Sequence, residues 1–338
     1  MIERLDGLVG LLGRTLWHLR LHGLVRRLSR NKPKVLLYHA CEPEEHPAIR
    51  GLGVNCSPSV FAAQLDHLAR HYQVVSLAEI ESGSARTGAV LITFDDGYRS
   101  VMDHAAPLLV AREMTAVVYL VTDVVGNDDV VWVNELNWLL VNRPAEVGPL
   151  ATAELGLPSR ATSSEVLSAA VCNYDPVTVE RLLENAWAEV GERSSMIDDL
   201  DLYLGWDEIR QMERAGFAFG SHTATHPDLT RVPAEDLHRE VERSVETITR
   251  ELGGCSSFAF PFGFTDPEVT AMVEGFGFDS VMLAGSVHPS DPPRRLSRVS
   301  LTSASDAQIF AELEVIGPTK RLIRSLLRRI GLPRPHAA

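Results

Sequence analysis

The chain has 338 residues, of which 45% are hydrophobic and 23% charged, and its formal net charge is −13. This composition is typical of a globular protein with enough chain to bury a large core, and it excludes a disordered or low-complexity protein. The charge is uneven, because residues 1–32 carry +5, residues 318–338 carry +6, and the region between them carries −24. An acidic body argues against nucleic acid as a partner, whereas two basic ends favour an anionic membrane surface.

Cysteine usage and the N-terminus bear on the cellular location. The four cysteines are widely spaced without a Cys-x-x-Cys pair, so neither a disulfide framework nor a zinc finger is expected. The apolar run 7–13 is too short to span a membrane, and no small-residue cleavage site follows it. We therefore expect a cytoplasmic protein, either free or peripheral on the cytoplasmic face of the membrane. Nothing in the sequence indicates an obligate protein partner.

The two basic ends share an amphipathic pattern. Residues 1–32 are predicted to form a basic amphipathic helix, because leucines recur at helical spacing and arginines occupy much of the other face. Such a helix either lies on anionic lipid or packs against the body. Residues 302–338 are predicted to form a helical basic tail, with the same pattern between Lys320 and Ile330.

Between these ends, residues 33–301 alternate strand-like and helix-like segments. The predicted strands are 35–39, 74–77, 89–95, 115–122, 217–221, 257–261, 280–284 and 295–301. Repeated βα units with buried strands predict a parallel sheet, and seven or eight of them predict its closure into a barrel. Residues 126–204 break this rhythm with helical patterns at 133–140, 164–170 and 176–190, and we interpret them as a mainly helical insertion.

The predicted strand 89–95 ends in two adjacent carboxylates, Asp95 and Asp96, followed by Gly97. Two acidic side chains at the end of a buried strand are costly unless they are neutralised, and a metal ion is the usual solution. The alternative is that Asp96 caps the following helix. In parallel barrels the functional groups gather at the C-terminal ends of the strands, which favours the metal interpretation here.

His222 and His226 follow the predicted strand 217–221 four residues apart. On one helical turn these side chains would point the same way, and Pro227 would end the turn. Two histidines and one aspartate are a ligand set suited to zinc or another divalent transition metal. One carboxylate of the acidic pair would join the histidines and its neighbour would be a candidate general base, which predicts hydrolysis of an amide or ester.

These stretches resemble known motifs. Residues 93–97, 222–226 and 260–263 are similar to the first three motifs of polysaccharide deacetylases, the nodulation-factor deacetylase homology domains of carbohydrate esterase family four. The resemblance covers about residues 35–125 and 205–301. Tyr38-His39, the 61–65 helix and residues 206–209 also look like a bacterial branch that acts in exopolysaccharide or lipopolysaccharide pathways.

The resemblance implies a distorted (β/α)7 barrel that removes N-acetyl groups from an amino-sugar polysaccharide or a lipid-linked glycan. It implies Asp95 as the catalytic base and one divalent metal ion, zinc or alternatively cobalt, nickel or manganese. The implied metal ligands are Asp96, His222 and His226. The implied wall of the sugar groove consists of Pro261, Phe262 and Gly263.

The chain also departs from the family pattern. The third motif often begins with an arginine that contacts the catalytic aspartate, but residues 257–259 contain none, and Arg298 is the candidate replacement. The late Leu-x-His motif that supplies a general acid is unclear, and His288 is the nearest candidate. His39, at the end of the first strand, is expected to line the site.

Two alternatives remain open from the sequence. The first is a hydrolase of a small amide or cyclic ureide on the same barrel. The second is a non-catalytic carbohydrate-binding relative, although a binding module has no need of a base beside a metal. The 126–204 insertion bears on the substrate, because a closing lid would favour a small or lipid-linked substrate and an open groove would favour a polymer.

Overall fold

The computed structural model describes residues 2–29, 33–85, 88–191, 193–283, 292 and 294–316. All eight predicted strands are present and pair in parallel. They are β1 (Lys34–Tyr38), β2 (Gln73–Val74), β3 (Ala89–Phe94), β4 (Val117–Leu120), β5 (Ala218–Ser221), β6 (Ser257–Ala259), β7 (Ser280–Leu283) and β8 (Arg295–Val299). Seven strands close into a ring in the order β1-β8-β7-β6-β5-β4-β3, and β3 pairs with β1. The expected (β/α)7 barrel is confirmed.

The second strand stands outside this ring. β2 has only two residues and pairs only with the first two residues of β3, so β1 and β3 are direct neighbours. All six residues of β3 are buried, as the continuous apolar run predicts for a strand covered on both faces. Alternate side chains such as Leu91, Tyr119 and Met282 point into the ring and form its packed interior.

Helices cover the outside of the barrel. They are α3 (Pro58–His71), α4 (Leu77–Glu81), α5 (Ala106–Val110), α11 (Trp206–Arg214), α12 (Ala234–Leu252) and α13 (Pro267–Glu274). The segment that connects β3 to β4 contains a π-helical turn, η1 (Val101–Ala105), followed by α5. Pro107 has no amide hydrogen and its ring crowds the preceding turn, which accounts for the wider turn before it.

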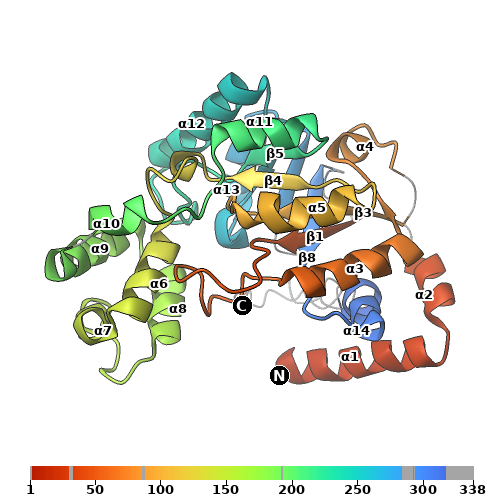
Figure 1. Cartoon of the computed structure of the whole chain (residues 1–338), viewed down its shortest axis with the longest axis horizontal. Helices are drawn as coiled ribbons and strands as arrows, with labels where there is room; N and C mark the ends of the chain where they lie inside the picture. Colours follow the sequence, from red (N-terminus) through yellow and green to blue (C-terminus); the bar gives the residue numbers. More distant parts are fainter. Residues whose placement is uncertain are drawn as a thin grey trace.

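The 126–204 region is helical, as predicted, and contains α6 (Trp132–Asn142), α7 (Pro144–Glu154), α8 (Ser163–Asn173), α9 (Pro176–Val190) and α10 (Arg193–Asp198). The sequence pattern missed α7 and α10, because α7 contains Pro149 without a clear apolar stripe and α10 is short. These helices lie together at one end of the barrel (Figure 1). Their core includes Tyr98 and Val124, which follow β3 and β4, so the insertion packs on the C-terminal ends of the strands.

The N-terminal segment forms two helices where one was expected, α1 (Ile2–His18) and α2 (His22–Ser29). The chain bends at Arg20, whose φ of 60° is left-handed and cannot continue a right-handed helix. α1 packs beside α14 (Asp306–Phe310) and η4 (Ala311–Ile316), as Figure 1 shows. A Cβ at Gly13 would lie 2.6 Å from the Cβ of Ala311, so this close contact requires glycine.

The predicted helical tail lies mostly outside the described residues, which end at 316. Among the described helices, none is both long and apolar enough to cross a membrane.

Candidate active site

Asp95 and Asp96 lie at the C-terminal end of β3. The Asp95 amide donates to the carbonyl of Tyr38 (2.9 Å), so the ladder with β1 continues as far as this residue. Asp96 and Gly97 then turn the chain sharply, with φ values of 68° and 73°. The next helical segment begins at Val101 with Ser100 before it, so Asp96 does not cap a helix.

His222 and His226 lie in the loop after β5 and not on a helical turn, so this part of the prediction is wrong. Thr223 and His226 have φ values of 70° and 65°, which an α-helix does not allow. The hydroxyl of Thr223 accepts a hydrogen bond from the His226 amide (3.0 Å) and closes the turn. This loop still brings the two imidazoles together, with ring centroids 4.8 Å apart.

Glu240 of α12 anchors the histidine loop. Its carboxylate accepts hydrogen bonds from the amides of Ala224 (3.1 Å) and Thr225 (2.9 Å) and from the hydroxyl of Thr225 (3.0 Å). Sequence reasoning missed this residue, because its role depends on the docking of α12 beside the loop. No short motif signals it.

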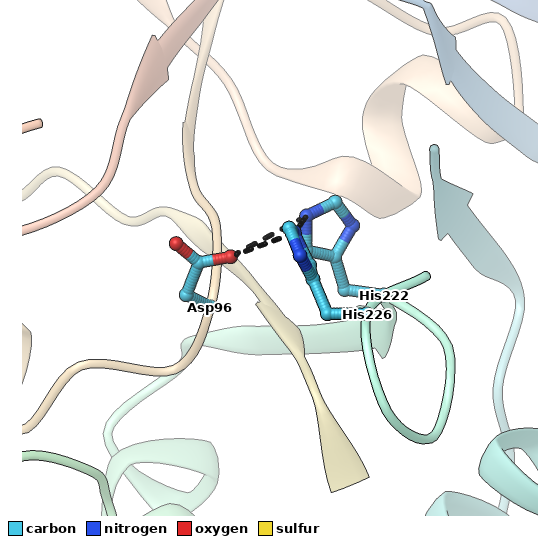
Figure 2. A group of neighbouring side chains, drawn as sticks. All are labelled: Asp96, His222 and His226. Atoms are coloured by element: carbon cyan, nitrogen blue, oxygen red, sulfur yellow. Dashed lines mark hydrogen bonds and ion pairs between the residues drawn. The ribbon is translucent and has the colours of Figure 1, made fainter. Parts of the chain in front are cut away.

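Asp96, His222 and His226 point toward one another (Figure 2), and all three side chains are buried. The Oδ1 atom of Asp96 lies 3.5 Å from Nε2 of His222 and 3.4 Å from Nε2 of His226, and the two nitrogens are 3.2 Å apart. Ligand bonds of about 2.0–2.1 Å in a tetrahedral arrangement place ligand atoms about 3.3–3.4 Å apart. The separations therefore fit one face of a tetrahedral metal site.

Hydrogen bonding around these atoms also fits a metal ion. Nδ1 of His222 lies 2.7 Å from the carbonyl oxygen of Ala259, which can only accept, so Nδ1 carries the proton and Nε2 presents its lone pair. Oδ1 of Asp96 is buried and has no hydrogen-bond partner among the described residues. A buried carboxylate oxygen without a donor is costly, and a cation would satisfy it. Within the described ranges, this is the one group of three such side chains that could hold an ion.

The electrostatics of the three side chains agree with this interpretation. Burial lowers the pKa of both His222 and His226, which favours the neutral imidazoles that metal ligation requires. Burial, and next the charge of Asp95, raises the pKa of Asp96 to about 7. A divalent cation would compensate the negative charge that the two adjacent carboxylates concentrate here.

Arg298 of β8 binds the other carboxylate. Its Nη1 and Nη2 atoms donate to Oδ1 and Oδ2 of Asp95 at 2.5 and 2.7 Å. Burial alone would raise the pKa of Asp95, but Arg298 and then His222 outweigh it and lower the pKa to about 2. Asp95 is therefore ionised at neutral pH, and its Oδ2 lies 3.6 Å from Nε2 of His222.

Four of the remaining predicted residues are described by the structure, and one is not. His39 follows β1 and is half-buried, and burial lowers its pKa to about 4 against the opposing effect of the Asp95 charge. Pro261, Phe262 and Gly263 form the turn η3 (Pro261–Gly263), and the Phe262 ring lies 4.5 Å from the His226 ring. His288 lies outside the described residues, so its predicted role as general acid stays a prediction.

Backbone strain concentrates at this site. Eight described residues other than glycine have positive φ, and four of them are Asp96, Thr223, His226 and Phe262. Such conformations persist only where the surroundings enforce them, and they cluster at functional sites.

The sequence of the chain matches the profile of one known family. The polysaccharide deacetylase profile matches residues 82–281. The chain belongs to the polysaccharide deacetylase family. This family consists of hydrolases that act on the N-acetyl amide bonds of carbohydrates. No curated protein matches this polysaccharide deacetylase.

Solved structures share the fold of this polysaccharide deacetylase. The deacetylase PplD from Streptococcus pyogenes, in complex with acetate, has a TM-score of 0.57 at 15% identity, covering 84% of this chain and 98% of that one. IcaB from Ammonifex degensii has a TM-score of 0.54 at 21% identity, with 84% and 97% covered. A polysaccharide deacetylase from Bacillus cereus has a TM-score of 0.54 at 19% identity, with 83% and 68% covered.

Proposed function

We propose that this polysaccharide deacetylase is a metal-dependent enzyme that removes N-acetyl groups from an amino-sugar glycan. Asp96, His222 and His226 would hold one divalent ion, and Asp95 would be the catalytic base. The observation that carries the proposal is the triangle of donor atoms, 3.2–3.5 Å on each side, with the ionised Asp95 carboxylate 3.6 Å from one corner. Two nitrogens and one carboxylate oxygen support zinc, with cobalt, nickel and manganese as alternatives.

The residues around the ion would have different roles in amide hydrolysis. When bound, the ion supplies Lewis acidity that polarises the acetamide carbonyl and acidifies the attacking water. Oδ2 of Asp95 would accept the proton of that water, and Arg298 keeps the carboxylate ionised and fixed in orientation. Phe262, stacked edge-on against His226, would contact the sugar and exclude bulk water.

Metal content and acetate release together test this proposal. We expect about one divalent ion in the wild type, loss of the ion in His222→Ala, and retention of the ion without acetate release in Asp95→Asn. The substrates are N-acetylated oligosaccharides, which release acetate, the molecule bound in the PplD structure. His238→Ala, at an exposed histidine of α12, is the matched control and should keep both metal and activity.

The same samples decide between the alternatives. A wild type that binds no metal would refute the assigned site and favour a non-catalytic carbohydrate-binding relative. Metal without acetate release would redirect the proposal to a small amide or cyclic ureide, which the same metal-loaded protein would be tested to hydrolyse.

We also propose that the enzyme works at an anionic membrane surface, on the cytoplasmic face. Seven large hydrophobic side chains of the described residues are exposed, and five of them lie on or between α1 and α2: Leu11, Leu12, Leu19, Leu21 and Leu24. Arg20 and Arg27 are exposed beside them. Exposed leucines flanked by arginines are typical of helices that lie in the interface of anionic lipid, where a lipid-linked glycan would be within reach.

Sedimentation with vesicles tests the membrane proposal. We expect binding to anionic but not to zwitterionic vesicles, and loss of binding in the combined variant Leu11→Ser, Leu12→Ser, Leu19→Ser. Val110→Ser with Val177→Ser replaces exposed apolar side chains elsewhere and should not change binding. Unchanged sedimentation after deletion of residues 1–30 and 319–338 would refute the proposal.

A further inference from the structure

A cavity of about 720 Å³ lies beside the histidine loop. Its walls come from α6, the end of α8, α9 and the first residue of α10, together with Thr225, Pro227 and Asp228 of the loop after β5. Thr225 and Pro227 flank His226 in the sequence. The cavity and the candidate metal site therefore share one segment of backbone.

Trp132 connects the cavity to the site. It lines the cavity, and its indole N–H donates to the carbonyl of His226 (3.1 Å). Its ring lies 5.7 Å from the ring of Phe262, which in turn lies 4.5 Å from the ring of His226. Trp132 therefore contacts both the cavity and the residues around the candidate metal site.

The charge of the cavity is strongly negative. Its ionisable lining consists of Asp129, Glu135, Glu180, Glu184, Asp228 and Arg193. Arg193, the one cationic side chain of the lining, forms ion pairs with Asp129 (2.6 Å) and Glu135 (2.6 Å). Glu180 and Glu184 are exposed and make no hydrogen bond or ion pair with any described residue. They lie one turn apart on α9, where two like charges repel each other.

The uncharged lining is apolar and aromatic. Trp132, Tyr174 and Trp187 contribute three rings, and aliphatic side chains such as Val179 and Leu183 complete the floor. Aromatic faces attract cations and pack against the C–H face of a sugar ring. An anionic ligand such as a lipid phosphate would be repelled by the free carboxylates. The combination instead fits a cationic sugar, with its ammonium group at Glu180 and Glu184 and its ring over the aromatic side chains.

We propose that this cavity binds an amino-sugar residue that has already lost its acetyl group and carries a free ammonium. This inference rests on the proposed function, because N-deacetylation is the reaction that produces such a residue in the same glycan. The enzyme would then bind partly deacetylated chains better than untouched ones, and each turnover would improve binding for the next.

Two carboxylate substitutions test the cavity without touching the metal site. Glu180→Gln with Glu184→Gln removes both free charges, and Glu146→Gln with Glu189→Gln removes two exposed charges of α7 and α9 away from the cavity. The probe is a fully de-N-acetylated glucosamine tetramer, and its binding is measured by calorimetry. We expect binding about tenfold weaker in the cavity variant, as for the loss of two partly exposed ion pairs, and unchanged in the control.

A second variant and a second readout complete the test. Ala188→Lys places a positive charge at an exposed position of the lining and should weaken tetramer binding in the same way. Acetate release from a partly deacetylated tetramer should fall in Glu180→Gln with Glu184→Gln, because its ammonium groups lose their partners, and should stay within about twofold of wild type in Glu146→Gln with Glu189→Gln.

The outcomes separate the two proposals. A wild type that releases no acetate would refute the proposed function. The binding of the tetramer would still test the proposed role of the cavity. Equal tetramer binding in the cavity variant and the control would overturn the inference. Tight binding of a neutral dodecyl glycoside, equal in the wild type and in Glu180→Gln with Glu184→Gln, would also overturn the inference, because it would identify the cavity as a site for apolar ligands.

Discussion

The guanidinium of Arg298 forms two parallel hydrogen bonds with the carboxylate of Asp95, at 2.5 and 2.7 Å, although the two residues are 203 positions apart. Both side chains are buried, and Asp95 lies next to the triangle of the proposed metal ligands. Bidentate geometry fixes the plane of the carboxylate as well as its charge. The orientation of the proposed base therefore depends on a side chain from the last strand of the barrel.

Arg298→Lys tests whether Asp95 needs the bidentate hydrogen bonds of Arg298 or only its positive charge. The ammonium keeps the positive charge but cannot form both hydrogen bonds, so we expect kcat for acetate release to fall about 10- to 100-fold through misplacement of Asp95. Metal content should not change, and atomic absorption on the same samples checks this. Arg295→Lys alters a guanidinium of the same strand that binds Glu274, and it should keep wild-type kcat. A parallel loss of kcat and metal would contradict this assignment.

Glu240→Gln should weaken metal binding. The carboxylate holds the amides of Ala224 and Thr225, and a neutral amide is a poorer acceptor, so the histidine loop loses its anchor. Partners that orient metal ligands typically contribute 10- to 100-fold in metal affinity. We expect metal affinity to fall by a factor in this range in Glu240→Gln, measured by competition with a chelator. Glu246→Gln, an exposed glutamate of the same helix, is the control. Equal metal affinity in both variants would refute the role of Glu240.

Gly220→Ala should destabilise the barrel. A Cβ at Gly220 would lie 2.6 Å from Cε1 of Tyr119 and 2.7 Å from the carbonyl oxygen of Ser257, and neither atom has room to move. We expect the free energy of unfolding in urea to fall by about 1–3 kcal/mol. Gly254→Ala, where nothing lies within 4 Å, should change it by less than about 0.5 kcal/mol.

The packing of α1 on the body should weaken at acid pH. Burial, and next the neighbouring His67, lowers the pKa of His71 to about 4, and its ring lies 5.5 Å from Trp17 of α1. An unfolded histidine has a pKa of about 6.5, so protonation favours the unfolded state. The stability from the neutral ring is complete above pH 6.5 and is lost as the pH falls toward 4.

Denaturation at two pH values measures this effect. Between pH 7 and pH 5 we expect the free energy of unfolding to fall by about 1 kcal/mol more in the wild type than in His71→Gln. This value allows for solvent screening of a partly exposed ring. Identical pH dependence in the two proteins would show that His71 does not carry the effect.

Much of the fold could be predicted from the sequence because strands such as β3 and β5 are short, largely buried runs followed directly by a polar residue. Those ends placed Asp96 and His222 at the same edge of the barrel, where the structure has them. The conformation of the histidine loop could not be predicted, because i, i+4 spacing does not determine φ. The positive φ at Thr223 and His226 arises in a turn that the Thr223 hydroxyl closes.

Other parts of the site depend on tertiary docking that no local pattern contains. The role of Glu240 follows from the position of α12, and the cavity beside Trp132 follows from the packing of α6 and α9 on the loop. Arg298 was a candidate from its strand alone, but its partner depends on which strands are neighbours.

The exclusion of β2 from the ring has a consequence for how this enzyme can change. Adjacent strands are about 4.8 Å apart, and β8 reaches β3 across β1 alone. A further strand inserted between β1 and β3 would move Arg298 one strand spacing farther from Asp95, a distance that its side chain could not span. The direct pairing of β1 with β3 therefore limits the size of the barrel, because it keeps the proposed base within reach of its arginine.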